Sequence, residues 1–226
     1  MRWWKRCSIR CAPPRPGVCC RASFQTAPRC SATSTLWQAA GLWHTINFLL
    51  LQQARERAGR EASPSAGVID SQSGKTTESG GPRGFDAGKK IKGRKRRIIT
   101  DPAGPLVAAR VHAADIQDRD GAPPLLAAIR YLFPWLRHVF ADGGYTGDKL
   151  TKALARHGKW QIEIVKRCDR STGFSVLPRH WVVERTLAWL NRNRRLAKDF
   201  EATIASAVAW VLVAHIRNVS RRLARA

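Results

Sequence analysis

The sequence predicts an α/β protein in which a mixed sheet is flanked by helices and preceded by an N-terminal helix. Short apolar runs typical of strands alternate along the chain with stretches of helical apolar spacing. The chain has 226 residues, which is enough for one full domain with a small appendage and too few for two large domains. No internal repeat interrupts this order.

Residues 1–35 show neither helical nor strand periodicity. Proline, cysteine, serine and arginine dominate them, so we expect a disordered or aberrant segment rather than a folded domain. Five of the six cysteines fall here, at spacings that do not match those of a zinc site, and in a reducing compartment we expect free thiols. They are Cys7, Cys11, Cys19, Cys20 and Cys30.

A helix of about 20 residues is predicted from Leu36, where apolar residues begin to recur at helical spacing. The polar stretch EASPSAG then predicts a linker. We therefore divide the chain into an N-terminal segment over 1–35, a helical region over 36–62 and a main domain over 63–226.

Short apolar runs in the main domain predict the strands of the sheet. They are VIDSQS, with Asp70 at the strand end; RRIIT and PLVAARVHA, joined by the turn DPAG; the start of HVFADGGY, a short strand ending in Asp142; and QIEIVKRC, which alternates like an edge strand. Residues 71–95 are rich in Gly, Lys, Ser and Thr, have little to bury, and predict an exposed loop.

Helices are predicted between and after these strands. One begins near Pro124 and should end or kink at Pro134, because proline lacks the N–H that a helix interior needs. The segment TGDKLTKALARHG predicts another, and two more are expected over about 181–198 and 201–224.

The charge of the chain points to its partner. It carries 40 Lys and Arg against 16 Asp and Glu, a formal net charge of +24, which is too large for an ordinary enzyme of neutral metabolites. A polyanion is expected, and nucleic acid first. An anionic membrane surface would attract the chain as well, but no run of about 18 apolar residues is present to span a bilayer. The first residues lack the apolar core of a signal peptide, so we expect a cytoplasmic protein.

Two groups of basic residues are candidates for DNA contact. The first lies in RGFDAGKKIKGRKRR and comprises Lys89, Lys90, Lys92, Arg94, Lys95, Arg96 and Arg97. The second comprises Arg185, Arg192, Arg194, Arg195 and Lys198. Both would suit a phosphate backbone without reading its sequence. The alternative is a solvated loop and a set of surface residues whose aliphatic stems cover apolar neighbours.

Three acids are candidates for chemistry. Asp70 and Asp142 are placed at the carboxyl ends of predicted strands, where functional groups of α/β sheets gather, and Glu184 lies on a predicted helix. Three converging carboxylates would form an oxygen site suited to Mg²⁺, and two such ions can activate a water or a 3′-hydroxyl for phosphodiester chemistry. The alternative is that the aspartates are turn or cap residues and that Glu184 pairs with a basic neighbour on its helix.

Several segments together resemble the DDE transposases of bacterial insertion sequences, specifically the insertion-sequence-five group, which is related to the insertion-sequence-four superfamily. The segments are VIDSQSGKTTESGGPRGFDAGKKIKGRKRRIITD, VHAADIQDRDGAPPLL, FPWLRHVFADGGYTG, IEIVKR and LPRHWVVERTLAWLNRNRRLAKDFE. The resemblance runs from about Leu36 to the C-terminus. It implies an RNase H-like fold in which Asp70, Asp142 and Glu184 are the catalytic and metal-binding triad.

The same resemblance implies the reaction and the partners. The protein would cut DNA strands and join 3′-hydroxyl ends to a target, with Mg²⁺ as cofactor and Mn²⁺ as a substitute. Its partner would be double-stranded DNA, both the element ends and the target, bound by a homodimer. It would act in the bacterial cytoplasm on the nucleoid and not at a membrane.

This chain departs from the family pattern at three positions. Gly74 replaces the usual valine and is expected to loosen the stretch after Asp70. Arg97 replaces a histidine, and His180 replaces an arginine four residues before Glu184. A histidine is charged only part of the time near neutral pH, so this last change is expected to affect activity. An inactive, basic DNA-binding remnant is therefore the alternative to an active transposase, and a simple nuclease is a third reading.

Residues 1–35 do not resemble the N-terminal helical region that the family carries. Codons can be chosen for them that encode, in another reading frame, a sequence close to that region. We therefore expect that a frameshift near Thr35 has replaced the native region by an out-of-frame peptide.

Overall fold

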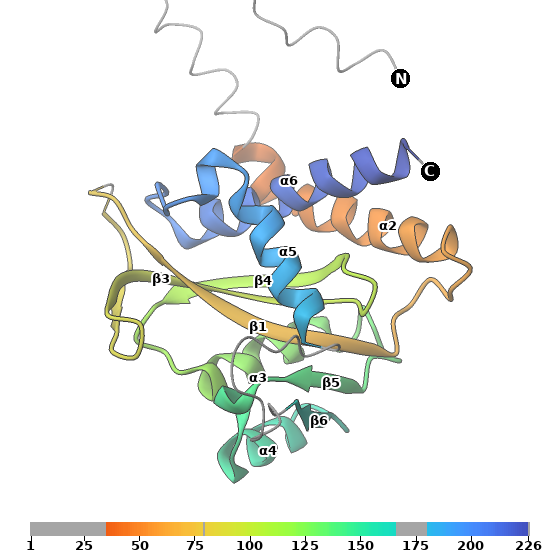
Figure 1. Ribbon diagram of the computed structural model, residues 1–226, viewed down its shortest axis with the longest axis horizontal. Helices are drawn as coiled ribbons and strands as arrows, with labels where there is room; N and C mark the ends of the chain where they lie inside the picture. The colour runs from red at the N-terminus through yellow and green to blue at the C-terminus, as the bar shows by residue number, and fades with distance from the viewer. Residues whose placement is uncertain (1–34, 79, 166–179, 226) are drawn as a thin grey trace, which may run out of the picture. The chain divides into compact units, whose positions relative to one another are not determined.

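The computed structural model describes residues 35–78, 80–165 and 180–225. The unit Trp37–Ala226 is compact by itself. Its strands are β1 (Ala66–Lys75), β2 (Gly84–Asp86), β3 (Ile91–Thr100), β4 (Leu106–Ala113), β5 (His138–Ala141) and β6 (Gln161–Ile164) (Figure 1). The helices are α2 (Leu42–Glu56), α3 (Asp118–Ile129), α4 (Asp148–Ala155), α5 (Trp181–Asn191) and α6 (Ile204–Leu223), with the 3₁₀ turns η3 (Gly143–Tyr145) and η4 (Arg194–Leu196).

The strands form one mixed sheet in the order β2, β3, β1, β5, β6, and β4 also pairs with β3. Strands β1, β3 and β4 are antiparallel neighbours, whereas β5 runs parallel to β1 and β6 parallel to β5. Parallel neighbours need a crossover, and α3 and α4 supply it before β5 and β6. The predicted mixed sheet flanked by helices is confirmed, and its strand order is that of the RNase H-like fold.

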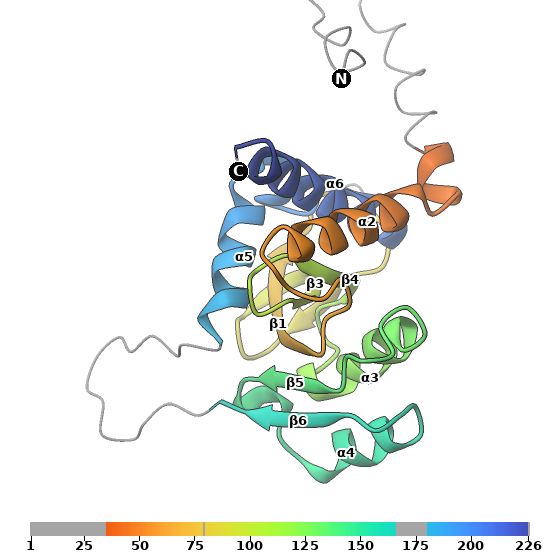
Figure 2. The same ribbon diagram turned by 90° about the vertical axis from the view of Figure 1, so that its right-hand side faces the viewer.

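Successive side chains of the central strands point to opposite faces of the sheet, so the apolar core forms two clusters, each between the sheet and a layer of helices. Val68 and Ile98 pack with residues of α5 and α6. Ile69 and Ile99 pack with residues of α3 and α4. The two helical layers lie on opposite sides of the sheet in Figure 2. Because each of these four side chains is at most 1% exposed, the central strands are covered on both faces.

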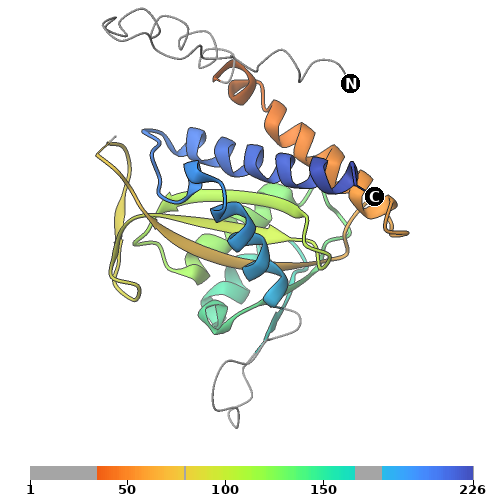
Figure 3. The same cartoon turned by 45° about the horizontal axis from the view of Figure 1, so that its top comes forward.

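Helix α2 packs along α6 and against β4 (Figure 3). Asn47 of α2 donates from Nδ2 to the carbonyl oxygen of Leu106 at 3.0 Å, and its Oδ1 lies 2.7 Å from Nδ1 of His215. Nε2 of His215 accepts from the N–H of Leu106 at 2.8 Å. A helix is present in the region predicted after Leu36, but α2 begins at Leu42 and has 15 residues rather than about 20. It lies in the same compact unit as the sheet.

The exposed loop predicted over 71–95 is wrong. Strand β1 continues to Lys75, and β3 begins at Ile91, with the short β2 between them. Gly74 does not interrupt β1, because it pairs in register with Arg94 of β3. The paired ends of β1 and β3 consist mainly of polar and charged residues, so they lack the alternation of apolar residues from which strands were predicted.

Three helix boundaries also differ from the prediction. Helix α3 begins at Asp118 rather than near Pro124, and it ends before Pro134. The helix predicted over 181–198 ends at Asn191 and is followed by η4. Helix α6 begins at Ile204, where the Thr203 side chain accepts a hydrogen bond from the N–H of Ser206 at 3.1 Å.

Among the described helices, none has the length and apolar content that crossing a membrane requires. The predictions for residues 1–34, the cysteines of that segment included, lie outside the described residues.

Candidate active site

Strand register brings the two predicted aspartates together. In the parallel pair of β1 and β5, Val68 lies opposite Phe140. Asp70 and Asp142 each lie two residues further along the chain, so the two side chains lie close together where β5 ends. Asp70 lies within β1 rather than at its end, which corrects the predicted strand boundary. Strand β5 ends at Ala141, just before Asp142. A third structural element can therefore approach the two carboxylates.

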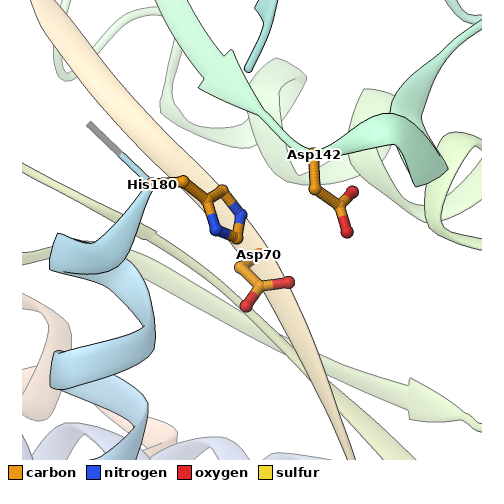
Figure 4. A group of neighbouring side chains, drawn as sticks. All are labelled: Asp70, Asp142 and His180. Atoms are coloured by element: carbon orange, nitrogen blue, oxygen red, sulfur yellow. The ribbon is translucent and has the colours of Figure 1, made fainter. Parts of the chain in front are cut away.

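That third element is the start of α5. One ligand atom each of Asp70, Asp142 and His180 lies within 4.8 Å of the others, and Figure 4 shows the imidazole turned toward the carboxylates. His180 occupies the position just before the first residue of α5, and its side chain makes no capping hydrogen bond there. The three residues thus come from β1, from the loop after β5 and from the end of a helix that packs against β1.

Each aspartate is held by a backbone N–H. The N–H of Ser71 donates to Oδ1 of Asp70 at 2.6 Å, and the N–H of Gly144 donates to Oδ1 of Asp142 at 3.0 Å. Burial raises the pKa of Asp70 to about 6, and the negative charge of Asp142 acts in the same direction. The hydrogen bond from Ser71 and the neighbouring side chains of His180 and Lys89 lower that pKa, but they only partly oppose the rise.

A divalent cation fits this pair. Two carboxylates that are close together and partly removed from water are destabilised as anions, and a bound cation relieves that cost. Ligand atoms around one small ion lie about 3–4 Å apart, which the observed spacing approaches. Carboxylate oxygens are the ligands that Mg²⁺ and Mn²⁺ prefer, so the residues present suit such an ion.

Glu184 lies next to this group but is not part of it. Its side chain is 52% exposed, and Oε1 lies 3.2 Å from Nδ1 of His180, one helical turn earlier on α5. The structure thus brings together two of the three predicted acids and places His180 between them and the third. The spacing of four residues between His180 and Glu184 is the feature of the sequence that indicates this contact, because residues i and i+4 are neighbours on a helix.

A second acid network lies on the other face of β1. Asp118, the first residue of α3, accepts from Oγ of Ser71 at 2.6 Å and from Nη2 of Arg97 at 3.0 Å, and Nζ of Lys95 lies 3.4 Å away. Burial acts to raise the pKa of Asp118, but Ser71, Lys95 and Arg97 together lower it. Sequence reasoning missed Asp118, because nothing near it in the chain marks its partners.

The basic residues of β3 are not on the surface. Arg94, Lys95, Arg96 and Arg97 are each at most 6% exposed, and they alternate between the two faces of the sheet. Arg94 contacts Asp199 at 3.3 Å, and Arg96 donates to the carbonyl oxygen of Lys198 at 3.1 Å. Lys95 and Arg97 point the other way, to Asp118. Because these four cations serve internal contacts, they offer little charge to a DNA backbone.

The remaining candidates for DNA contact lie at the surface, with one exception. The exposed residues are Lys89, Lys90, Lys92, Arg192, Arg194, Arg195 and Lys198. Arg195 also pairs with Glu201 at 2.7 Å. The exception is Arg185, whose guanidinium lies 4.7 Å from the ring centre of Trp181 and 4.8 Å from that of Trp189. Lys89 stands nearest the aspartates, with Nζ 3.4 Å from the carbonyl oxygen of Ser71.

Comparison with known proteins agrees with this arrangement. Residues 61–219 match the family described as Transposase DDE domain, which covers more than half of the chain. A protein of Burkholderia cepacia, named as a transposase for insertion sequence element IS402, is 33% identical over 116 residues. The match covers 48% of this chain and 54% of that protein, so the chain spans about half the length of the curated relative.

Proposed function

Because the chain belongs to the Transposase DDE domain family, we propose that it is the transposase of a bacterial insertion sequence of the insertion-sequence-five group. The reaction would be cleavage of DNA strands and transfer of 3′-hydroxyl ends to a target. The observation that carries the proposal is the convergence of Asp70 and Asp142 beside the N-terminus of α5, where β5 ends. The strong positive charge of the chain suits a DNA substrate.

Asp70 and Asp142 would hold the metal, with Mg²⁺ first and Mn²⁺ as a substitute, and Glu184 would complete the site as its third acid. Such an ion, when bound, supplies Lewis-acid activation of the attacking hydroxyl and stabilisation of the leaving oxygen. The chain's own residues set the geometry. The N–H groups of Ser71 and Gly144 fix the two carboxylates, so these enter the reaction already oriented.

The DNA backbone would lie along exposed basic residues that begin beside this site and extend to the far end of α5. Lys89 stands beside β1 near Asp70, and the group after Glu184 continues the positive surface along the end of α5 and η4. That group consists of Arg192, Arg194, Arg195 and Lys198. Substituting Lys89 or Arg192 by Gln should reduce the salt dependence of DNA affinity by about 0.9 in log–log slope for each lost phosphate contact. Lys152→Gln, on the exposed side of α4, is the matched control and should leave the slope unchanged.

A cleavage assay tests the proposed reaction. The full chain is incubated with DNA that carries the ends of the element, with Mg²⁺ or Mn²⁺ and with EDTA. We expect metal-dependent cutting that Asp142→Asn abolishes. Asp148→Asn, which removes an exposed acid six residues further on, should cut like the wild type. Cutting that Asp142→Asn leaves intact would refute the assignment of the site.

An inactive DNA-binding remnant is the second candidate, motivated by residues 1–35 and by His180 in place of the family's arginine. In that case the chain binds DNA in a salt-sensitive manner and does not cut it. We retain the proposal that a frameshift near Thr35 produced residues 1–35. The nucleotide sequence tests it, because stop codons in the alternative frame would rule it out.

Transfer of two element ends to one target requires both ends in one complex, so we propose that a homodimer acts on DNA. Sedimentation of the chain with and without end DNA measures this directly. We further propose that the protein works on the nucleoid in the bacterial cytoplasm.

A further inference from the structure

A buried imidazole without a hydrogen-bond partner on one side lies where the two aspartates converge. The His180 side chain is 5% exposed. Its Nδ1 contacts Glu184, but its Nε2 is buried and meets no hydrogen-bond partner among the residues that the structure describes. In Figure 4 the ring is turned toward Asp70 and Asp142, and the three ligand atoms lie within 4.8 Å of one another.

This arrangement is costly unless something binds between the three side chains. A buried polar atom without a hydrogen-bond partner has lost its contact with water and gained nothing in return. Two neighbouring carboxylates add their mutual repulsion. A cation among the three would supply the missing partner of Nε2 and compensate both negative charges.

We propose that Nε2 of His180 is a ligand of the metal ion that Asp70 and Asp142 hold, and that Glu184 orients the ring through Nδ1. The inference rests on the proposed function, since it needs a metal at the two aspartates. A metal-bound histidine commonly donates its other N–H to a carboxylate, which fixes the tautomer and the ring plane. The 3.2 Å contact between Nδ1 and Oε1 of Glu184 provides that carboxylate. Glu184 would thus complete the site as a positioning residue.

A nitrogen ligand changes which ions the site prefers. A site of oxygen atoms alone suits Mg²⁺, whereas an imidazole ligand favours divalent transition metals over Mg²⁺. The chain should therefore bind Mn²⁺ more tightly than Mg²⁺ by a margin that depends on His180. Mn²⁺ is also a suitable probe because it binds carboxylates well and the thiolates of cysteine poorly.

The first test needs no substitution. Full-length protein without DNA is loaded with one equivalent of Mn²⁺, and pulsed electron paramagnetic resonance is used to detect coupling to ¹⁴N. We expect the coupling of one directly bound imidazole. A Mn²⁺ signal that Asp142→Asn removes but that carries no nitrogen coupling would overturn the inference and leave the proposed metal site intact. Binding that Asp142→Asn does not weaken would instead count against the proposed site itself.

Substitutions then separate the two roles. We expect His180→Gln to weaken Mn²⁺ affinity by about tenfold or more and to abolish the nitrogen coupling, with a smaller effect on Mg²⁺. Glu184→Gln should weaken affinity by about 10–100-fold while the nitrogen coupling persists, since the ligand itself remains. Loss of Mn²⁺ affinity in Glu184→Gln together with an unchanged affinity in His180→Gln would overturn the inference, because Glu184 would then be the direct ligand.

The chain contains a matched control for both substitutions. His138 and Glu163 form another histidine–carboxylate contact, with Nε2 2.8 Å from Oε2, at the paired strands β5 and β6. His138→Gln should leave Mn²⁺ affinity and the nitrogen coupling unchanged. If His138→Gln removes the coupling, the bound nitrogen belongs to that pair and the inference fails. Circular dichroism on every variant establishes that the fold is retained before binding is compared.

Discussion

Asp142 stands beside Asp70 because the parallel pairing of β1 and β5 places Val68 opposite Phe140, and each aspartate lies two residues further along its segment of the chain. The carboxylates meet where β5 ends and α5 begins, and that position removes them from water on one side. Burial raises the pKa of Asp70 to about 6, above its ordinary value of 3.8. In the metal-free protein at neutral pH, the ionised carboxylate of Asp70 therefore destabilises the fold.

Asp70→Asn should stabilise the metal-free protein above pH 6. The pKa of Asp70 is higher in the folded than in the unfolded chain, so wild-type stability is lost as pH rises from about 4 through about 6. We expect the substitution to add about 1–3 kcal/mol to the unfolding free energy at pH 7.5 and nothing below pH 4. Urea unfolding across that pH range measures it. Asp115→Asn, an exposed acid, is the control, and an Asp70→Asn protein less stable than the wild type at pH 7.5 would contradict the prediction.

Gly121→Ala should destabilise the protein through Arg97. A Cβ at position 121 would overlap Nη1 of the buried Arg97 guanidinium. We expect a loss of about 1–3 kcal/mol in the wild-type background, because a packed core accommodates added atoms poorly. In the Arg97→Ala background the same change should be neutral or stabilising by up to about 1 kcal/mol, since alanine favours a helix over glycine.

The control for that cycle is Gly88→Ala, where the nearest atom would be 3.5 Å from the new Cβ. Thermal or urea unfolding of the four cycle proteins gives the coupling. Equal costs of Gly121→Ala in both backgrounds would show that Arg97 is not the cause.

Asp118→Ala should cost about 3–5 kcal/mol, because it leaves the buried Arg97 without its carboxylate, whereas Lys95 keeps its contact with Asp86. Asp120→Ala on the same helical turn is the matched control. Its partner Lys149 is 73% exposed, so the loss should stay below about 1 kcal/mol. The comparison is made by urea unfolding at one pH and salt concentration, and similar costs for the two variants would argue against a structural role of the Asp118 network.

His215 should make stability fall in mild acid. Complete burial lowers its pKa to about 3, so between pH 6.5 and 3 the unfolded chain binds a proton that the folded chain does not. The resulting loss is about 2 kcal/mol by pH 5. His215→Gln should show a correspondingly shallower decline in unfolding free energy between pH 7 and 5, whatever its stability at pH 7. An identical decline in both proteins would exclude His215 as the source.

Local patterns were sufficient for much of the architecture. Apolar runs located β4 and β5, and helical spacing located α2 and α6, because these elements bury one stripe or face of apolar residues. The position of Asp142 followed from the end of such a run. These features depend on neighbours within one element, which a sequence displays directly.

The burial of the basic residues of β3 could not be predicted from local sequence patterns. Arg94 and Arg97 look like surface residues in the sequence, and they enter the core only because Asp199 and Asp118 reach them from opposite faces of the sheet. Their burial depends on partners far away in the chain, and charge alone does not name those partners.

The sequence by itself determined the fold class and the place of Asp142 just after a strand, since these follow from periodicity, and its net charge is the ground on which we expect a polyanionic partner. Only the tertiary structure decided that His180 stands between those aspartates and Glu184, and that the basic strand β3 lies inside the protein. The physical reason is that burial and ion pairing are set by contacts between elements. Residues that are remote in the chain are brought together there by strand register and helix packing.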